Sequence, residues 1–322
     1  MRELILLCET AAVPPDDIEA DPSFEIRVIS DLVNANSPKE EIQVQGCGGC
    51  RGLGAVAAYL EKARGRHAVA AYVQDRDYRP LKWAEDSYTD GKRGFMWRRH
   101  EVENYLAEPE VVVQAMETLR ASLTELPSGP PSWADALPVR VQAVHEVLSD
   151  CARQRAVVEA ASMTLWSLQG DIDCMGRVQV RQPVLVHPSG ALFERWECVS
   201  AIRRECERVI TGARTLQNRA VLDPDQAERR YEAILAEIST VEYRAQRRFL
   251  RDFGGAELLT SFHRWLSQSC GVRIRRQRLM TELALAAPAV YTNNPRLFDP
   301  DDFRELAEGI VSLAEARAKA WA

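Results

Sequence analysis

Two aspartates, Asp75 and Asp77, follow a strongly apolar stretch and are separated by a single residue. The stretch from Ala68 to Val73 consists of small and β-branched residues, which is typical of a buried parallel strand with an exposed carboxyl end. Side chains alternate between the faces of a strand, so residues two apart point the same way and both carboxylates can converge. Because two such carboxylates repel each other unless a cation lies between them, we expect a divalent-metal site here.

A third carboxylate, Glu9, directly follows the apolar segment 3–8. It can simply end a strand, but an acid at the tip of the first strand of an α/β sheet also lies where such folds bind ligands. A strand–helix–strand–helix–strand order over the first 75 residues predicts a parallel sheet with right-handed crossovers. Glu9, Asp75 and Asp77 would then share one edge of the sheet. Ligands that are all oxygen suit Mg²⁺ or Mn²⁺ and disfavour zinc.

The elements that would position these acids form an α/β fold, with a parallel sheet flanked by helices. We expect strands over 3–8, 42–44, 68–73 and 95–97, and helices over 24–33, 55–63, 101–106 and 110–122. The polar segment 78–92 has the composition of a surface loop. The glycine-rich segment 46–54 predicts a tight turn into a helix, since it matches neither the GxGxxG pattern nor a P-loop.

A segment rich in proline and serine, residues 127–138, is the best candidate for a domain boundary. It predicts a metal-binding catalytic domain over 1–126 and a mostly helical domain over 139–322. In the second domain we expect helices over 139–169, 190–216, 223–250, 256–269 and 300–320, and an edge strand over 178–186. Long helices of this kind can contact nucleic acid or form a homodimer interface.

The composition is that of an ordinary globular protein: the 322 residues are 46% apolar and 27% charged. No segment approaches the roughly 18 consecutive apolar residues of a membrane helix, and the N-terminus has no signal-peptide pattern. We therefore expect a cytoplasmic protein without a membrane partner.

Arginines are clustered although the net charge is −6, which argues against a protein coated in nucleic acid. The densest cluster contains Arg273, Arg275, Arg276 and Arg278, and four charges this close cannot all find local acidic partners. We interpret it as a candidate nucleic-acid contact. The doublets at 98–99, 203–204 and 247–248 are interpreted as exposed helix faces that pair with glutamates.

The eight cysteines are mostly isolated, which favours reduced thiols over a disulfide framework. Cys47 and Cys50 form a CxxC pair, but no second pair follows at a spacing that suits zinc, and a redox role is a minor alternative. The histidines show no ligand or triad spacing, and we assign them structural roles; they are His67, His100, His145, His187 and His263.

Four features occur in a set order along residues 1–120. An acid follows the first strand, a Gly-Gly turn the second and a DxD pair the third, and the segment Trp97–Leu106 then reads WxxxxxENYL. This combination resembles the TOPRIM-like domains of the DUF4435 and OLD-nuclease group, and within it the TOPRIM effectors of PARIS anti-phage systems.

The resemblance implies roles for individual residues. Glu9 would be a metal ligand or general base, Asp75 and Asp77 the metal-binding pair, and Glu103 a further ligand. Glu103 is equally well explained as an acid that stabilises a helix N-terminus. The implied activity is Mg²⁺-dependent phosphodiester hydrolysis of tRNA or DNA in anti-phage defence, with an ATPase partner of the ABC or AAA type.

Two departures weaken this resemblance. The family's Glu-Gly pair is Glu9-Thr10 here, and Ala256 stands where a Gly-Lys-x-Leu-Leu segment has lysine. A catalytically silent subunit of an ATPase complex is therefore one alternative. Another is a sugar-nucleotide transferase whose DxD pair holds Mn²⁺ against a diphosphate, although that leaves Glu9 without a role.

Overall fold

The structure, a computed structural model, describes residues 3–9, 24–37, 40–47, 52–65, 68–88, 92–124, 131–173, 180–212, 223–298 and 301–321. The chain divides into two compact units. The first unit comprises Met1–Glu146 and Gly255–Ala322, and the second comprises Val147–Gly254. This division differs from the expected boundary at 127–138, of which 127–130 lie outside the described residues. The C-terminal segment joins the N-terminal sheet because its helices cover apolar surface there.

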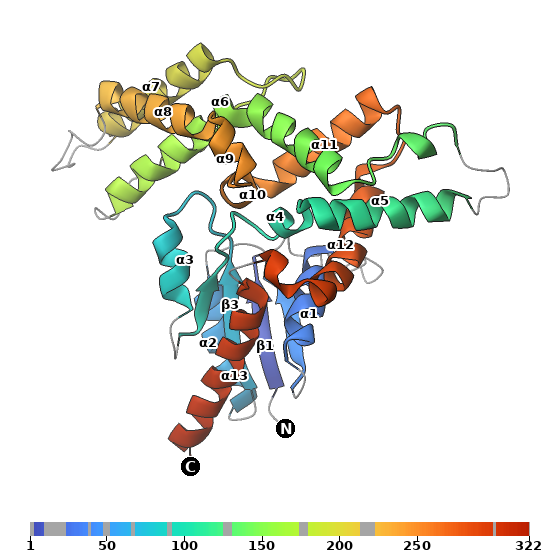
Figure 1. The fold of residues 1–322 in the computed structure, drawn as a ribbon. Helices are drawn as coiled ribbons and strands as arrows, with labels where there is room; N and C mark the ends of the chain where they lie inside the picture. The colour runs from blue at the N-terminus through green and yellow to red at the C-terminus, as the bar shows by residue number, and fades with distance from the viewer. Residues whose placement is uncertain are drawn as a thin grey trace. The chain divides into compact units, whose positions relative to one another are not determined.

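The first unit contains a four-stranded sheet in the order β2-β1-β3-β4 (Figure 1). Its strands are β1 (Glu3–Cys8), β2 (Ile42–Gly46), β3 (Ala68–Gln74) and β4 (Gly94–Met96). Every pairing is parallel, so the predicted α/β class is confirmed. The two central strands, β1 and β3, are almost entirely buried, which explains why their sequences are continuously apolar rather than alternating.

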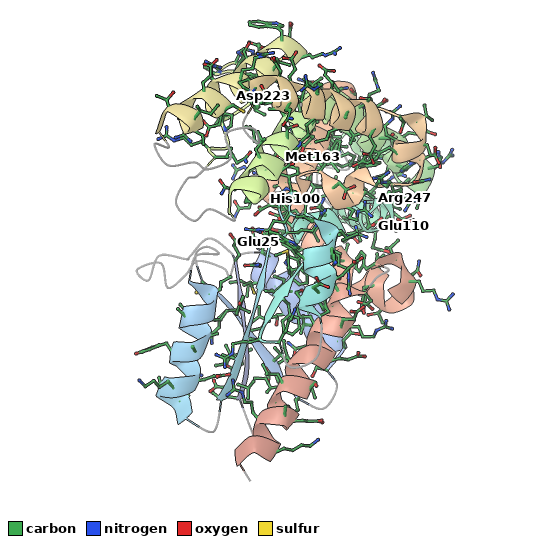
Figure 2. The ribbon with its side chains drawn as sticks, turned by 90° about the vertical axis from the view of Figure 1, so that its left-hand side faces the viewer. Glu25, His100, Glu110, Met163, Asp223 and Arg247 are labelled. Atoms are coloured by element: carbon green, nitrogen blue, oxygen red, sulfur yellow. The ribbon has the colours of Figure 1, made fainter. Side chains whose placement is uncertain are left out.

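Helices cover both faces of this sheet. On one face, Leu53 and Ala57 of α2 (Leu53–Arg64) form a buried cluster with Ile5 and Leu7 of β1 and with alanines of β3. On the other face lie α1 (Phe24–Ala35) and α13 (Asp302–Trp321), which contact each other and the strands (Figure 2). α13 thus contributes the C-terminal end of the chain to the core of the N-terminal sheet.

The remaining helices of the first unit run above the carboxyl ends of the strands or beside the sheet (Figure 1). They are α3 (Leu81–Ser87), α4 (Glu103–Leu106), α5 (Pro109–Thr124), α11 (Gly255–Ser269) and α12 (Arg276–Asn293), with short 3-10 turns at Ala134–Ala136 and Pro295–Phe298. The expected loop over 78–92 is wrong, because it contains α3. We did not expect α12, since it is buried on several sides and contains Pro288, so it lacks a clear amphipathic pattern.

The second unit is helical in its described part. Its helices are α6 (Val141–Asp173), which begins in the first unit, α7 (Arg195–Gly212), α8 (Pro224–Ile238), α9 (Val241–Ala245) and α10 (Phe249–Asp252). The expected single helix over 223–250 is broken twice, at the Thr240 N-cap and at Arg247, which has a φ of 55°. The expected strand over 178–186 is reduced to one bridge between Val186 and Leu192 in the part that the structure describes.

The described helices include none that is long and apolar enough to span a bilayer.

Candidate active site

Glu9 and Asp75 lie at the carboxyl ends of two adjacent strands. Cys8, the last residue of β1, is in register with Val73 of β3, so the two strands end at nearly the same level of the sheet. The expectation that these acids share one edge of the sheet is therefore confirmed for the backbone. This is the edge at which open α/β sheets bind ligands.

Asp77 reaches this edge for a different reason from the one predicted. β3 ends at Gln74, and Asp77 lies in a turn with a φ of 51°, so the alternation of a strand does not apply to it. Its amide donates to the carbonyl of His100 at 3.0 Å, and its carboxylate accepts from Arg79 Nη1 at 3.0 Å. The same Arg79 nitrogen donates to the carbonyl of Asp75 at 2.7 Å, which closes the turn.

Asp75 is a strongly perturbed acid of this cluster. Burial raises the pKa of its carboxyl well above the usual value. Four neighbouring carboxylates raise it further: Glu101, Glu103, Glu9 and Asp77. Burial also raises the pKa of Glu103, with Glu101 and Glu25 of α1 adding to the effect. Among the described residues, the groups that act most strongly on Asp75 are therefore all acidic, although Arg79 pairs with the neighbouring Asp77.

Glu101 belongs to this cluster although the sequence analysis did not select it. It follows β4, whose carboxyl end lies at the same edge as that of β3 because Gln74 pairs with Met96. The sequence does contain one signal for Glu101, which is its position two residues before Glu103. Both acids lie in the segment that crosses the end of the sheet after β4. The ExE spacing repeats that of the DxD pair.

The Glu101 carboxylate is held at the N-terminus of α11. Its Oε1 accepts a hydrogen bond from the amide of Ala256 at 2.6 Å. Burial alone would raise the pKa of Glu101, but His100 and the amides of Ala256 and Gly255 outweigh it and lower the pKa. Glu101 is thus a fixed carboxylate that caps a helix, as acids at helix N-termini commonly do.

Gly255 allows α11 to begin directly against α4. A Cβ atom at this position would lie 2.5 Å from the amide nitrogen of Asn104 and 2.7 Å from the carbonyl carbon of Glu103. Asn104 is fully buried, and its side-chain oxygen accepts the amide of Glu101 at 2.9 Å. The ENYL segment and the Gly-Gly segment, far apart in sequence, therefore form one structural junction beside the acids.

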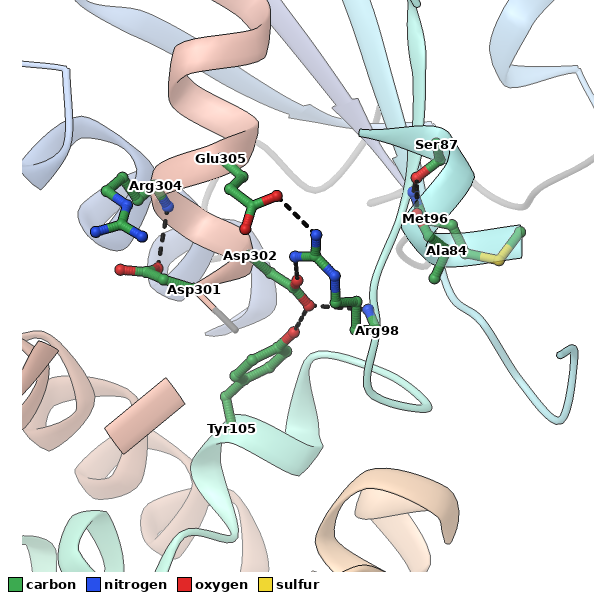
Figure 3. A network of polar contacts seen from close by, with 9 residues as sticks. All are labelled: Ala84, Ser87, Met96, Arg98, Tyr105, Asp301, Asp302, Arg304 and Glu305. Atoms are coloured by element: carbon green, nitrogen blue, oxygen red, sulfur yellow. Dashed lines mark hydrogen bonds and ion pairs between the residues drawn. The ribbon is translucent and has the colours of Figure 1, made fainter. Parts of the chain in front are cut away.

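A buried ion pair anchors this junction to α13 (Figure 3). Arg98 contacts Asp302 through Nη1 at 2.5 Å and through its amide at 2.8 Å, and the hydroxyl of Tyr105 donates to the same carboxylate. The side chain of Arg98 is 11% exposed and that of Asp302 1%. Arg99 likewise pairs with the buried Glu108 at 2.5 Å. Our interpretation of the 98–99 doublet as an exposed helix face is therefore wrong.

Two groups in the cluster lack hydrogen-bond partners in the part of the chain that the structure describes. One is the buried Oε2 of Glu9. The other is the ring of His100, which is 7% exposed and has no hydrogen bond at either nitrogen. Its Nδ1 lies 3.8 Å from Oε2 of Glu101, beyond hydrogen-bonding distance. In Figure 2, His100 and Glu25 both lie at the end of the sheet where the strands finish.

The acids have the donor chemistry for a hard divalent cation, but their side chains are not arranged around one. Among the described residues, no group of three or more His, Cys, Asp and Glu side chains has the geometry to hold a metal ion. The unpartnered Glu9 oxygen and the excess of negative charge at Asp75 nevertheless fit Mg²⁺ or Mn²⁺. Binding therefore requires the carboxylates to rotate toward a common point.

The arginine cluster lies at the start of α12 and is exposed. Arg278 donates to Glu282, one turn further along the helix, at 2.7 Å. Within the described residues, Arg273, Arg275 and Arg276 make no ion pair, and all three are exposed. Positive charge at a helix N-terminus opposes the helix dipole, so this surface favours an anion.

Other candidates give little support for chemistry. Cys8 is a buried free thiol next to Cys47, whereas Cys50 and Thr10 lie outside the described residues, so neither the CxxC pair nor the Glu-Thr departure can be placed. His187 is paired with Glu197 at 3.1 Å, and His263 with the carbonyl of Ile274 at 2.7 Å.

Comparison with known proteins adds no identification. No protein-family model matches the chain, and no curated protein matches it. The TOPRIM resemblance and the residue roles that it implies therefore stay predictions, alongside a fold that agrees with the expected α/β class.

Proposed function

We propose that this protein hydrolyses phosphodiester bonds with the help of Mg²⁺ or Mn²⁺ bound at the acidic cluster. The observation that carries the proposal is the environment of Asp75, a half-buried carboxyl with four acids around it at the ligand-binding edge of a parallel sheet. Such a concentration of like charge costs stability unless a cation or a proton neutralises it. A perturbed acid in this position is a functional-site candidate.

In this proposal Glu9, Asp75, Asp77 and Glu103 hold the ion. When bound, the ion would polarise the scissile phosphate, lower the pKa of a bound water and shield developing negative charge. Glu101 stays bound to the amide of Ala256, so it adds negative potential without needing to move. Oε2 of Glu9, which has no hydrogen-bond partner among the described residues, would accept a proton from the attacking water.

The substrate in this proposal is a nucleic acid, either tRNA or DNA. The exposed arginines at the start of α12 would bind its phosphates, since unpaired arginines in a cluster are a footprint of polyanion binding. A role in anti-phage defence, a homodimeric assembly, an ATPase partner and a cytoplasmic location complete the proposal. These last parts depend on the sequence resemblance.

A second candidate is a catalytically silent subunit. Two observations favour it: the described acids are not arranged in metal-binding geometry, and position 256 offers a backbone amide where the resembling family has lysine. In this case the cluster would be a remnant that no longer binds a cation.

Cleavage assays with purified protein distinguish the two candidates. Supercoiled DNA, single-stranded RNA and bulk tRNA are incubated with the protein and Mg²⁺ or Mn²⁺. We expect the wild type to cleave one substrate class. The cleavage rate should fall by about a hundredfold or more in Asp75→Asn. It should not change in Asp150→Asn, the control, which replaces an exposed aspartate on α6. Equal cleavage by both variants would reject the mechanism, and no cleavage by the wild type would favour the silent subunit.

A further inference from the structure

The imidazole of His100 is an unsatisfied group inside the acidic cluster. Both ring nitrogens are buried and have no hydrogen-bond partner among the described residues. Leaving a buried polar group unsatisfied is unfavourable, so most such groups in folded proteins have a partner. A ligand that is present only in the functional state would account for this one.

The ring is fixed in place rather than free to turn toward solvent. It packs edge-on against the ring of Tyr78, with a centroid distance of 4.4 Å and an interplanar angle of 68°. The carbonyl of His100 accepts the amide of Asp77 at 3.0 Å, which ties its backbone to the turn after β3. His100 therefore moves together with that turn.

The ring also lies among the acids that we assign to the ion. It is close enough to Asp77 and Glu101 to act electrostatically on both carboxyl groups, and its Nδ1 is 3.8 Å from Oε2 of Glu101. A cation drawn to these carboxylates would meet the two ring nitrogens of His100 beside them. From the sequence we expected a structural role for His100, since it shows no ligand or triad spacing.

We propose that His100 supplies a nitrogen ligand to the ion at the acidic cluster and thereby favours Mn²⁺ over Mg²⁺. This inference rests on the proposed function, because it needs the cluster to bind a cation. Mg²⁺ prefers oxygen ligands and gives up its waters reluctantly, whereas a transition-metal ion accepts imidazole readily. An oxygen-only set would give no such preference.

The test uses the full chain and the metal chlorides alone. Mn²⁺ and Mg²⁺ affinities are measured by calorimetry, and the coupling of bound Mn²⁺ to nitrogen is measured by pulsed electron paramagnetic resonance. His100→Asn replaces the imidazole with an amide, and His100→Phe keeps a ring against Tyr78 without nitrogen. His187→Asn is the matched control, since His187 also lies beside a glutamate, but in the second unit.

We expect Mn²⁺ to bind the wild type and the control with nitrogen coupling. In both His100 variants that coupling should disappear, and the preference for Mn²⁺ should fall by roughly tenfold or more. Should His100→Phe fail to fold, His100→Asn decides the test.

Two failures are distinguishable. Wild-type protein that binds Mn²⁺ without nitrogen coupling, or His100→Asn with an unchanged metal preference, would overturn the role of His100 and leave the proposed function standing. Wild-type protein that binds neither ion would overturn both.

Discussion

Oε1 of Glu101 accepts a hydrogen bond from the amide of Ala256, a residue 155 positions further along the chain. This contact joins the segment after β4 to the N-terminus of α11, and it fixes one acid of the cluster as a carboxylate. The cluster is therefore built by two parts of the sequence that are separated by the whole second unit.

The junction between α11 and α4 should not tolerate a larger residue at position 255. Gly255→Ala would bring a Cβ to 2.5 Å from backbone of Asn104, so we expect a loss of about 1–3 kcal/mol in the free energy of unfolding. Urea denaturation measures it. Gly54→Ala is the control: its Cβ would meet the Tyr72 ring at an ordinary 3.4 Å, so no loss is expected. Equal stability of the two variants would mean that the junction is not tightly packed.

Neutralising Asp75 should stabilise the metal-free protein. Asp75→Asn replaces a half-buried carboxyl, whose ionisation its surroundings oppose, with a neutral amide, and we expect a gain of about 1 kcal/mol or more in the free energy of unfolding in the presence of a chelator. Thermal denaturation checks this, with Asp150→Asn, an exposed aspartate, expected to change nothing. A lower melting temperature for Asp75→Asn would show that the acid has a structural role instead.

The stability of the metal-free protein should fall as the pH rises. The pKa values of Asp75 and Glu103 are raised by folding, so above the ordinary values of 3.8 and 4.5 the folded state binds more protons than the unfolded state. Stability then decreases with pH until the raised pKa values are passed. Mg²⁺ or Mn²⁺ should reduce this loss, because the ion replaces the protons. The free energy of unfolding is measured at a series of pH values, with and without Mn²⁺. Parallel curves of stability against pH in the two conditions would contradict the replacement of protons by the ion.

Removing Arg98 should destabilise the protein strongly. Arg98→Ala leaves the carboxylate of Asp302 buried and without its cation, a change that typically costs about 3–5 kcal/mol. Arg120→Ala breaks an exposed pair with Asp135, and there we expect about 0–1 kcal/mol. Chemical denaturation of both variants gives the comparison; similar losses in the two would mean that the Arg98 pair is effectively solvated.

The arginines at the start of α12 should contribute to nucleic-acid affinity and to its salt dependence. Replacing Arg273, Arg275 and Arg276 with glutamine should weaken binding of a fluorescent RNA or DNA and reduce the slope of log affinity against log salt by up to about three. The triple variant should fold normally, since all three side chains are exposed. Unchanged affinity would place the nucleic-acid contact elsewhere.

The sheet and the position of two acids could be predicted because they depend on local pattern. Continuous apolar segments such as 3–8 and 68–73 indicate buried parallel strands, and adjacent strands bring Glu9 and Asp75 to one edge. The strand alternation that we predicted for Asp77 does not apply, since its positive φ places it in a turn after β3.

The parts that could not be predicted depend on contacts between distant segments. Glu101 joins the site through an amide on α11, and Arg98 is buried because Asp302 lies in the C-terminal helix. α12 was not predicted because a helix that is buried on several sides has no polar face, so its apolar residues show no helical period in the sequence. Long-range pairings of this kind leave little trace in one sequence.

The central claim is that the acids from β1, β3 and the segment after β4 share a divalent cation, and a calorimetric titration of the wild type and Asp75→Asn with MnCl₂ tests it most directly. We predict saturable binding to the wild type at millimolar concentration or below, and its loss in the variant. Absence of binding to the wild type, or equal binding to both proteins, would contradict the claim.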